Sequence, residues 1–96
     1  MPFGSQNQDA ELTSEQIRAA RVSLTLSTRM VAEATGIGIA TIKRYEAVSG
    51  VPKSRKGHLA LLRKYFEAQG IEFIGTPDNA PGIRVHGTAA NDGKGH

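Results

Sequence analysis

The sequence contains no cysteine and no long apolar run. The absence of cysteine excludes disulfide bonds, thiolate metal sites and cysteine nucleophiles, and it is typical of proteins in the reducing cytoplasm. No apolar stretch approaches the roughly 20 residues that a membrane-spanning helix needs, so we expect no membrane partner. Residues 1–11 are polar and partly acidic, unlike a secretory signal. We therefore expect a cytoplasmic protein.

The sequence also lacks a recognisable catalytic or metal-binding pattern. His58, His86 and His96 do not have the spacing of metal ligands. No serine or carboxylate stands in a known catalytic motif. Residues 36–38 (Gly-Ile-Gly) match a fragment of a nucleotide-binding loop, but the third glycine and the preceding strand are missing. We expect no enzyme activity, no metal and no cofactor.

Basic residues are concentrated in one part of the chain. Residues 43–64 contain seven lysines and arginines and the single acid Glu46, whereas the remaining residues contain five basic and eight acidic side chains. A concentrated basic stretch indicates a polyanionic partner, although a solvated helix face gives the same pattern.

Capping and periodicity signals predict four helices within residues 12–70. Thr13 with Gln16 has the capping-box spacing, Ser27 is a second N-cap candidate, and Ser54 is the candidate for the fourth helix. Gly36 is expected to end the second helix in the left-handed conformation. Apolar side chains recur at helical spacing and predict the inward positions Ile17, Ala20, Leu24, Met30, Val31, Ala32, Ala34, Ile42, Tyr45, Leu59, Leu62 and Phe66.

Two short strands are predicted after the helices, at residues 71–74 and 83–86. Residues 76–79 (Thr-Pro-Asp-Asn) between them have turn chemistry. The separation is longer than a tight hairpin requires, so pairing within one subunit or between two subunits stays open. The predicted fold class is mainly α: a compact four-helix bundle with a helix-turn-helix, followed by two short C-terminal β-strands.

Four residues have the pattern of a helix-turn-helix motif. Ala32 is small enough for close contact between two helices, and Gly36 allows a sharp turn four residues later. Ile37 supplies an apolar plug in the turn, and Ile42 an apolar anchor in the following helix. In this motif the second helix enters the major groove of DNA.

The stretch from Leu12 to Phe66 resembles the lambda-repressor-like (Cro/XRE-type) DNA-binding domain. Residues 27–37 resemble the second helix and turn of that family, residues 41–46 the close of its recognition helix, and residues 62–85 the tail of small bacterial regulators of this type. The family includes repressors, activators and antitoxins. The chain departs from it at Gly38, Ile39 and Ala40, where the family has polar side chains.

The resemblance and the side-chain chemistry together give a set of DNA-contacting residues. We expect base contacts from Ile39, which can meet a thymine methyl group, from Ala40, whose small side chain allows close approach, and from Lys43 and Arg44. Arg44 is the better candidate for guanine, because its planar fork matches O6 and N7. Phosphate contacts are expected from Thr28, Gly38, Thr41, Lys53, Ser54, Arg55 and Lys56.

The sequence therefore predicts a DNA-binding transcription regulator. We expect a repressor that binds an inverted-repeat operator of double-stranded DNA as a homodimer, with Ile71, Phe73, Ile83 and Val85 forming the dimer contact. The alternative is a protein-binding antiactivator or antitoxin that kept the fold, which the apolar pair Ile39 and Ala40 favours. The predicted organisation is a flexible tail (1–11), a DNA-binding domain (12–70), a dimerisation segment (71–86) and a second flexible tail (87–96).

Overall fold

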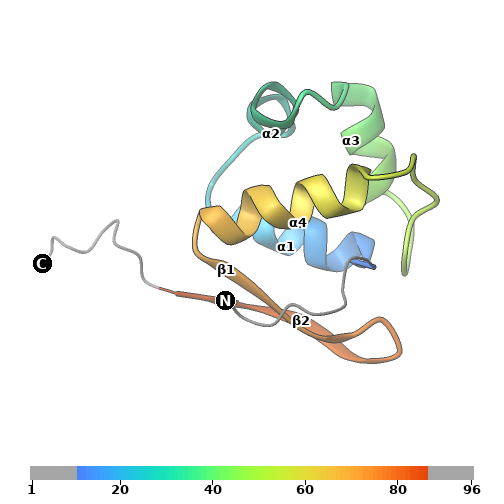
Figure 1. Cartoon of the computed structure of the whole chain (residues 1–96), viewed down its shortest axis with the longest axis vertical. Helices are drawn as coiled ribbons and strands as arrows, with labels where there is room; N and C mark the ends of the chain where they lie inside the picture. The colour runs from blue at the N-terminus through green and yellow to red at the C-terminus, as the bar shows by residue number, and fades with distance from the viewer. Residues whose placement is uncertain (1–10, 87–96) are drawn as a thin grey trace, which may run out of the picture.

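The computed structural model describes residues 11–86, which form four helices and one antiparallel two-stranded sheet (Figure 1). The elements are α1 (Ser14–Ser23), α2 (Thr28–Thr35), α3 (Ile39–Glu46), α4 (His58–Ala68), β1 (Ile71–Thr76) and β2 (Asn79–Val85). Of the two predicted tails, 1–11 and 87–96, only Glu11 lies within the described residues. Helices α1 and α4 lie between the α2–α3 pair and the β-hairpin (Figure 1).

The predicted starts of the first two helices and the predicted end of the second are confirmed. Thr13 and Gln16 form the capping box of α1, because each side chain binds the main-chain N–H of the other residue. The Ser27 hydroxyl accepts a hydrogen bond from the Met30 amide at the start of α2. Gly36 ends α2 with a φ of 83°, the left-handed conformation that was expected.

The predicted cap of the fourth helix is wrong. Helix α4 begins at His58 rather than beside Ser54, and its N-cap is Gly57, which makes no side-chain cap hydrogen bond. Residues 52–57 form a loop and turn, and the His58 amide donates to the Arg55 carbonyl oxygen at 3.0 Å. The four polar residues Lys53 to Lys56 therefore belong to the loop and not to the helix.

The two strands are longer than predicted and form a tight hairpin. Thr76 pairs with Asn79 across Pro77 and Asp78, so the predicted turn is confirmed. The expectation that the strands are too far apart in the sequence for a tight hairpin is wrong, because β1 extends to Thr76 and β2 begins at Asn79. The register shifts by one residue between Ile74 and Thr76. Gly75 lies at this irregularity, and Asn79 and Pro81 lie in β2, although these residue types are uncommon in regular strands.

The hairpin belongs to the same hydrophobic core as the helices. Ile71 is fully buried, and Phe73 and Ile83 pack against the core cluster. The Gln16 side-chain amide donates to the carbonyl oxygens of Ile74 and Gly82, at 3.2 and 2.9 Å. The capping-box glutamine of α1 thus also fastens the sheet. The core consists of Leu12, Ile17, Ala20, Val31, Ile37, Ile42, Tyr45, Leu59, Leu62, Phe66 and Ile71.

The predicted fold class, a mainly α four-helix bundle with two short strands added to it, is therefore wrong. Four helices and two strands are present as expected, but only about half of the described residues are helical. The strands contain six and seven residues and pack on α1 and α4. The fold is a mixed arrangement of four short helices and a two-stranded sheet around one core.

The packing of the hairpin also changes the predicted dimer contact. Ile71 has no exposed surface to offer a second subunit, and Phe73 and Ile83 already contact the helices of their own chain. Val85 alone of the four predicted residues is mostly exposed, at 51%. The apolar face of the hairpin is used largely within the subunit because α1 and α4 cover it.

Candidate nucleic-acid interface

The junction of α2 and α3 contains the four small and apolar residues that the sequence pattern singled out. Gly36 turns the chain, and Ile37 in the turn is 3% exposed. Ile42 of α3 is fully buried, and Ala32 of α2 packs against the same core. The turn is closed further by Thr35, whose hydroxyl accepts the Ile37 amide at 3.2 Å. One face of each helix is thereby fixed to the core.

The opposite face of α3 is exposed and carries the predicted base-contacting residues. Ile39 is 38% exposed, and Ala40, Lys43 and Arg44 are also exposed, whereas Thr41 is half-buried. The Arg44 guanidinium lies 5.7 Å from the centre of the Tyr45 ring. The first turn of α3 thus presents apolar surface and its second turn presents cations.

Helix α1 holds the C-terminal end of α3 through a buried ion pair. Arg21 donates from Nε and from a terminal nitrogen to the two carboxylate oxygens of Glu46, both at 2.8 Å, and also to the Leu26 carbonyl oxygen at 2.9 Å. The two side chains are 18% and 8% exposed. The hydrogen bonds to Glu46 raise the pKa of Arg21 above its ordinary value. Arg18 donates to the Glu46 carbonyl oxygen at 2.7 Å.

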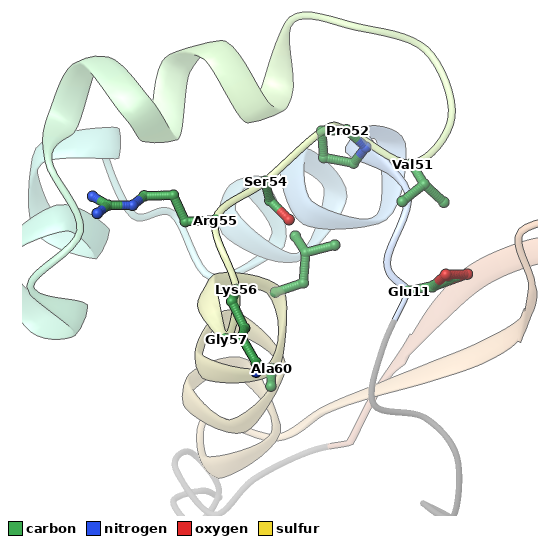
Figure 2. Close-up of a pocket in the computed structure, with 9 residues that line it drawn as sticks. Glu11, Val51, Pro52, Ser54, Arg55, Lys56, Gly57 and Ala60 are labelled. Carbon is green, nitrogen blue, oxygen red and sulfur yellow. The ribbon is translucent and has the colours of Figure 1, made fainter.

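The predicted phosphate-contacting residues after α3 lie in an exposed loop. Lys53, Ser54, Arg55 and Lys56 are all exposed. An open cavity of about 290 Å³ lies beside them. Figure 2 shows Glu11 at one side of this cavity and Arg55 at the opposite side, with the Arg55 side chain pointing away from Glu11. The cavity is lined by Glu11, Val51, Pro52, Ser54, Arg55, Lys56, Gly57, Leu59 and Ala60.

The chain before this loop is tied to the start of α1. The Glu15 carboxylate accepts the Gly50 amide at 3.2 Å, and the Ser14 amide donates to the Gly50 carbonyl oxygen at 2.8 Å. Hydrogen bonds from the main-chain amides of Glu15 itself and of Gly50 lower the pKa of Glu15. Both the end of α3 and the start of the loop therefore depend on α1.

Cations are distributed unevenly between the two ends of the molecule. Those on α2, α3 and the following loop have no carboxylate partner within residues 11–86, and they are Arg29, Lys43, Arg44, Lys53, Arg55 and Lys56. By contrast, three arginines of α1, α4 and β2 form ion pairs, which join Arg21 to Glu46, Arg63 to Glu67 and Arg84 to Glu72. Of the other cations on these elements, Arg18 donates to a main-chain carbonyl oxygen and Lys64 has no carboxylate partner within residues 11–86. Unpaired cations are available to bind an anionic partner.

Most of the predicted DNA-contacting residues are brought together on this side of the molecule. Thr28 begins α2, Gly38 is the N-cap of α3, and the Arg55 amide is bonded to the Tyr45 hydroxyl of α3 at 3.1 Å. Sequence reasoning missed the supporting pair Arg21 and Glu46. They are 25 residues apart, and no local pattern connects them.

No group of three or more histidine, aspartate or glutamate side chains within residues 11–86 is arranged to hold a metal ion. Among the helices in the described part of the chain, none has the length and apolar character needed to cross a membrane. His96 lies outside the described residues.

The chain matches no protein-family model, no curated protein and no solved structure.

Proposed function

We propose that the protein is a cytoplasmic, sequence-specific DNA-binding regulator of transcription that acts as a repressor. The observation that carries this proposal is the exposed face of α3, where Ile39, Ala40, Lys43 and Arg44 stand beside a loop of unpaired cations. Unpaired cations also keep a protein surface soluble, but their concentration beside an exposed helix is the arrangement that attracts the phosphates of DNA.

In the proposed complex, α3 lies in the major groove, which is wide enough to admit one helix. Ile39 and Ala40 contact thymine methyl groups, and Arg44 donates to guanine, with Lys43 beside it. The phosphates on either side are bound by Thr28, Gly38 and Thr41 of the helix-turn-helix and by the loop residues Lys53, Ser54, Arg55 and Lys56.

We further propose that a homodimer binds an inverted repeat whose half-site centres lie about 10 bp apart, or a multiple of that spacing. The small size of the folded unit supports association, since a second subunit adds buried surface. Val85, which is 51% exposed at the end of β2, is the apolar side chain of the hairpin that remains free to contribute. Light scattering after gel filtration measures the mass of the free protein and of its complex with DNA. A mass that corresponds to one subunit in both samples refutes the proposed homodimer.

The test is enrichment of duplexes from a random-sequence pool, followed by fluorescence anisotropy with the enriched duplex and a shuffled version. Specific binding requires preference for the enriched duplex. If three loop cations per subunit each neutralise one phosphate, a dimer should give a slope of log K against log salt of about −5.

Lys53→Glu should weaken binding strongly. Lys64→Glu, an exposed site on α4 with the same charge change, is the matched control. Failure of the wild type to bind any duplex at low salt refutes the proposal.

A second candidate function is capture of a protein partner. It is favoured by the apolar side chains in and after α3, because Ile39, Val48 and Val51 are 38%, 45% and 38% exposed. Reversing two charges in the loop, with Lys53→Glu and Arg55→Glu, separates the candidates. The double variant should lose DNA binding and repression under the first proposal, and it should keep its regulatory activity under the second.

A further inference from the structure

Tyr45, near the end of α3, has a fully buried side chain whose hydroxyl reaches two other parts of the chain. The Arg55 amide in the basic loop donates to this hydroxyl oxygen at 3.1 Å. Nδ1 of His58, the first residue of α4, lies 2.7 Å from the same oxygen. The Tyr45 and His58 rings meet edge to face, with centroids 5.8 Å apart. One hydroxyl therefore joins α3, the loop and α4.

The main chain of the same residue is held by α1. The Ser14 hydroxyl donates to the Tyr45 carbonyl oxygen, and Arg18 donates to the next carbonyl oxygen, that of Glu46. Tyr45 is thus fixed at its backbone by one helix and at its side chain by the loop. Motion of the loop relative to α3 requires the hydrogen bond between the Arg55 amide and the Tyr45 hydroxyl to break.

The hydrogen bonds of the Tyr45 hydroxyl can all be satisfied in one arrangement. A phenol offers one donor and two acceptor sites. The oxygen accepts the Arg55 N–H, and in the His58 tautomer that carries its proton on Nε2 the O–H donates to Nδ1. A buried hydroxyl and a loop amide without these partners would each be left unsatisfied, which is costly in a protein interior.

We propose that Tyr45 is a positioning residue, whose hydroxyl fixes the basic loop relative to α3 so that both engage the same DNA segment. This inference rests on the proposed function. Base edges in the groove and the flanking phosphates lie at fixed separations, so groups that read both must be held in register. A loop that is not held in this register contacts its phosphates only part of the time, so fewer counterions are released and binding weakens.

The test is Tyr45→Phe, which removes only the hydroxyl oxygen, and the matched control is Tyr65→Phe. Tyr65 is half-buried on α4, and its hydroxyl makes no hydrogen bond within residues 11–86. Salt titration with the enriched duplex should show a slope shallower by about 0.9 for each phosphate that the loop no longer neutralises. Affinity at low salt should fall about threefold to tenfold. The control should match the wild type in both quantities.

A double-variant cycle identifies the loop as the route of the effect. Arg55→Ala alone should also reduce the slope, and in that background Tyr45→Phe should have a smaller effect than in the wild type. An effect of full size in the Arg55→Ala background overturns the inference. Hydrogen exchange on the free wild-type protein gives a measurement that does not depend on the variants. The Arg55 amide should be protected, and exchange as fast as that of an open loop amide overturns the inference.

The outcomes distinguish the inference from the function on which it rests. If the wild type binds no duplex, the proposed function fails and the inference falls with it. If the wild type binds and Tyr45→Phe keeps its affinity and salt slope, the inference alone is refuted. A shallower slope in Tyr45→Phe, with an unchanged slope in Tyr65→Phe, supports it.

Discussion

The ion pair between Arg21 and Glu46 gives the sharpest prediction about stability. Replacing Glu46 with alanine removes both hydrogen bonds that the carboxylate accepts at 2.8 Å and leaves the guanidinium with the Leu26 carbonyl oxygen. Breaking a buried pair by removing one partner costs about 3–5 kcal/mol. Arg21 is 18% exposed and regains some hydration. We therefore expect the free energy of unfolding to fall by about 3 kcal/mol, at the lower end of that range.

Thermal and urea denaturation followed by circular dichroism measure this change. In a domain of this size, 3 kcal/mol corresponds to a decrease in Tm of about 12–24 °C. Glu67→Ala is the matched control, because Glu67 pairs with Arg63 one turn away on α4 through a single hydrogen bond of 3.2 Å. Exposed pairs of this spacing contribute about 0.3–0.5 kcal/mol, and for this pair, whose side chains are 20% and 22% exposed, we expect at most about 1 kcal/mol.

Similar decreases in stability for Glu46→Ala and Glu67→Ala would refute the reasoning. A second outcome checks the cause. Replacing both partners with apolar residues, as in Arg21→Met with Glu46→Leu, leaves no unpaired buried charge and should recover much of the stability that Glu46→Ala removes. A double variant less stable than Glu46→Ala would contradict that explanation.

Three other parts of the molecule give further predictions. Gly36→Ala should lower the free energy of unfolding by about 1–2 kcal/mol through its positive φ alone, because an added Cβ meets no atom within 4 Å. Gly75→Ala should lower it further, since its Cβ would collide with a main-chain carbonyl group of β2. Equal decreases in the free energy of unfolding, measured by urea denaturation, would contradict this. The hydrogen bond to His86 lowers the pKa of Glu72 below its ordinary value of 4.5, so its contribution to stability is present above pH 4.5 and is lost as the pH falls through the lower folded pKa. Acid titration of Glu72→Gln should show a smaller decrease in stability over that range, and an unchanged acid transition would refute the assignment. Replacing operator thymines with deoxyuridine should weaken binding about fourfold per contacted methyl group, since burying a CH₂ group contributes about 0.8 kcal/mol. The difference in affinity between the thymine and deoxyuridine duplexes should disappear in Ile39→Ala. Equal affinities of the wild type for the two duplexes, measured by anisotropy, would exclude this contact.

The features that sequence reasoning predicted correctly are those with a local cause. The capping box at Thr13 and Gln16, the cap at Ser27 and the left-handed Gly36 each depend on a few neighbouring residues. Most inward positions of the helices followed from their spacing in the same way, but in α2 the spacing was wrong for Met30, which is 48% exposed, and for Ala34, which is also exposed. Ser54 failed as a cap because capping chemistry indicates only where a helix can begin, and here the chain makes one more turn before α4.

The errors concern features that tertiary packing decides. Strand residues such as Pro81 and Gly82 have low strand propensity, yet they lie in β2 beside β1 because the hairpin rests on α1 and α4. The same packing buries Ile71, which the sequence assigned to a dimer contact. An apolar strand residue indicates burial, but the sequence alone does not say whether the surface that buries it belongs to the same chain.

Glu46 shows how the fold alters the meaning of a charge count. In the sequence it is the one acid among seven basic residues, where it reduces the net charge of the stretch. In the structure it is 7% exposed and is neutralised by Arg21, which comes from outside that stretch. The acid is thereby withdrawn from the surface that Lys43 and Arg44 share with the loop. The surface is consequently more uniformly basic than the sequence indicates. Glu46, which lowers the net charge of this stretch in the sequence, is the residue through which α1 holds α3 in the structure.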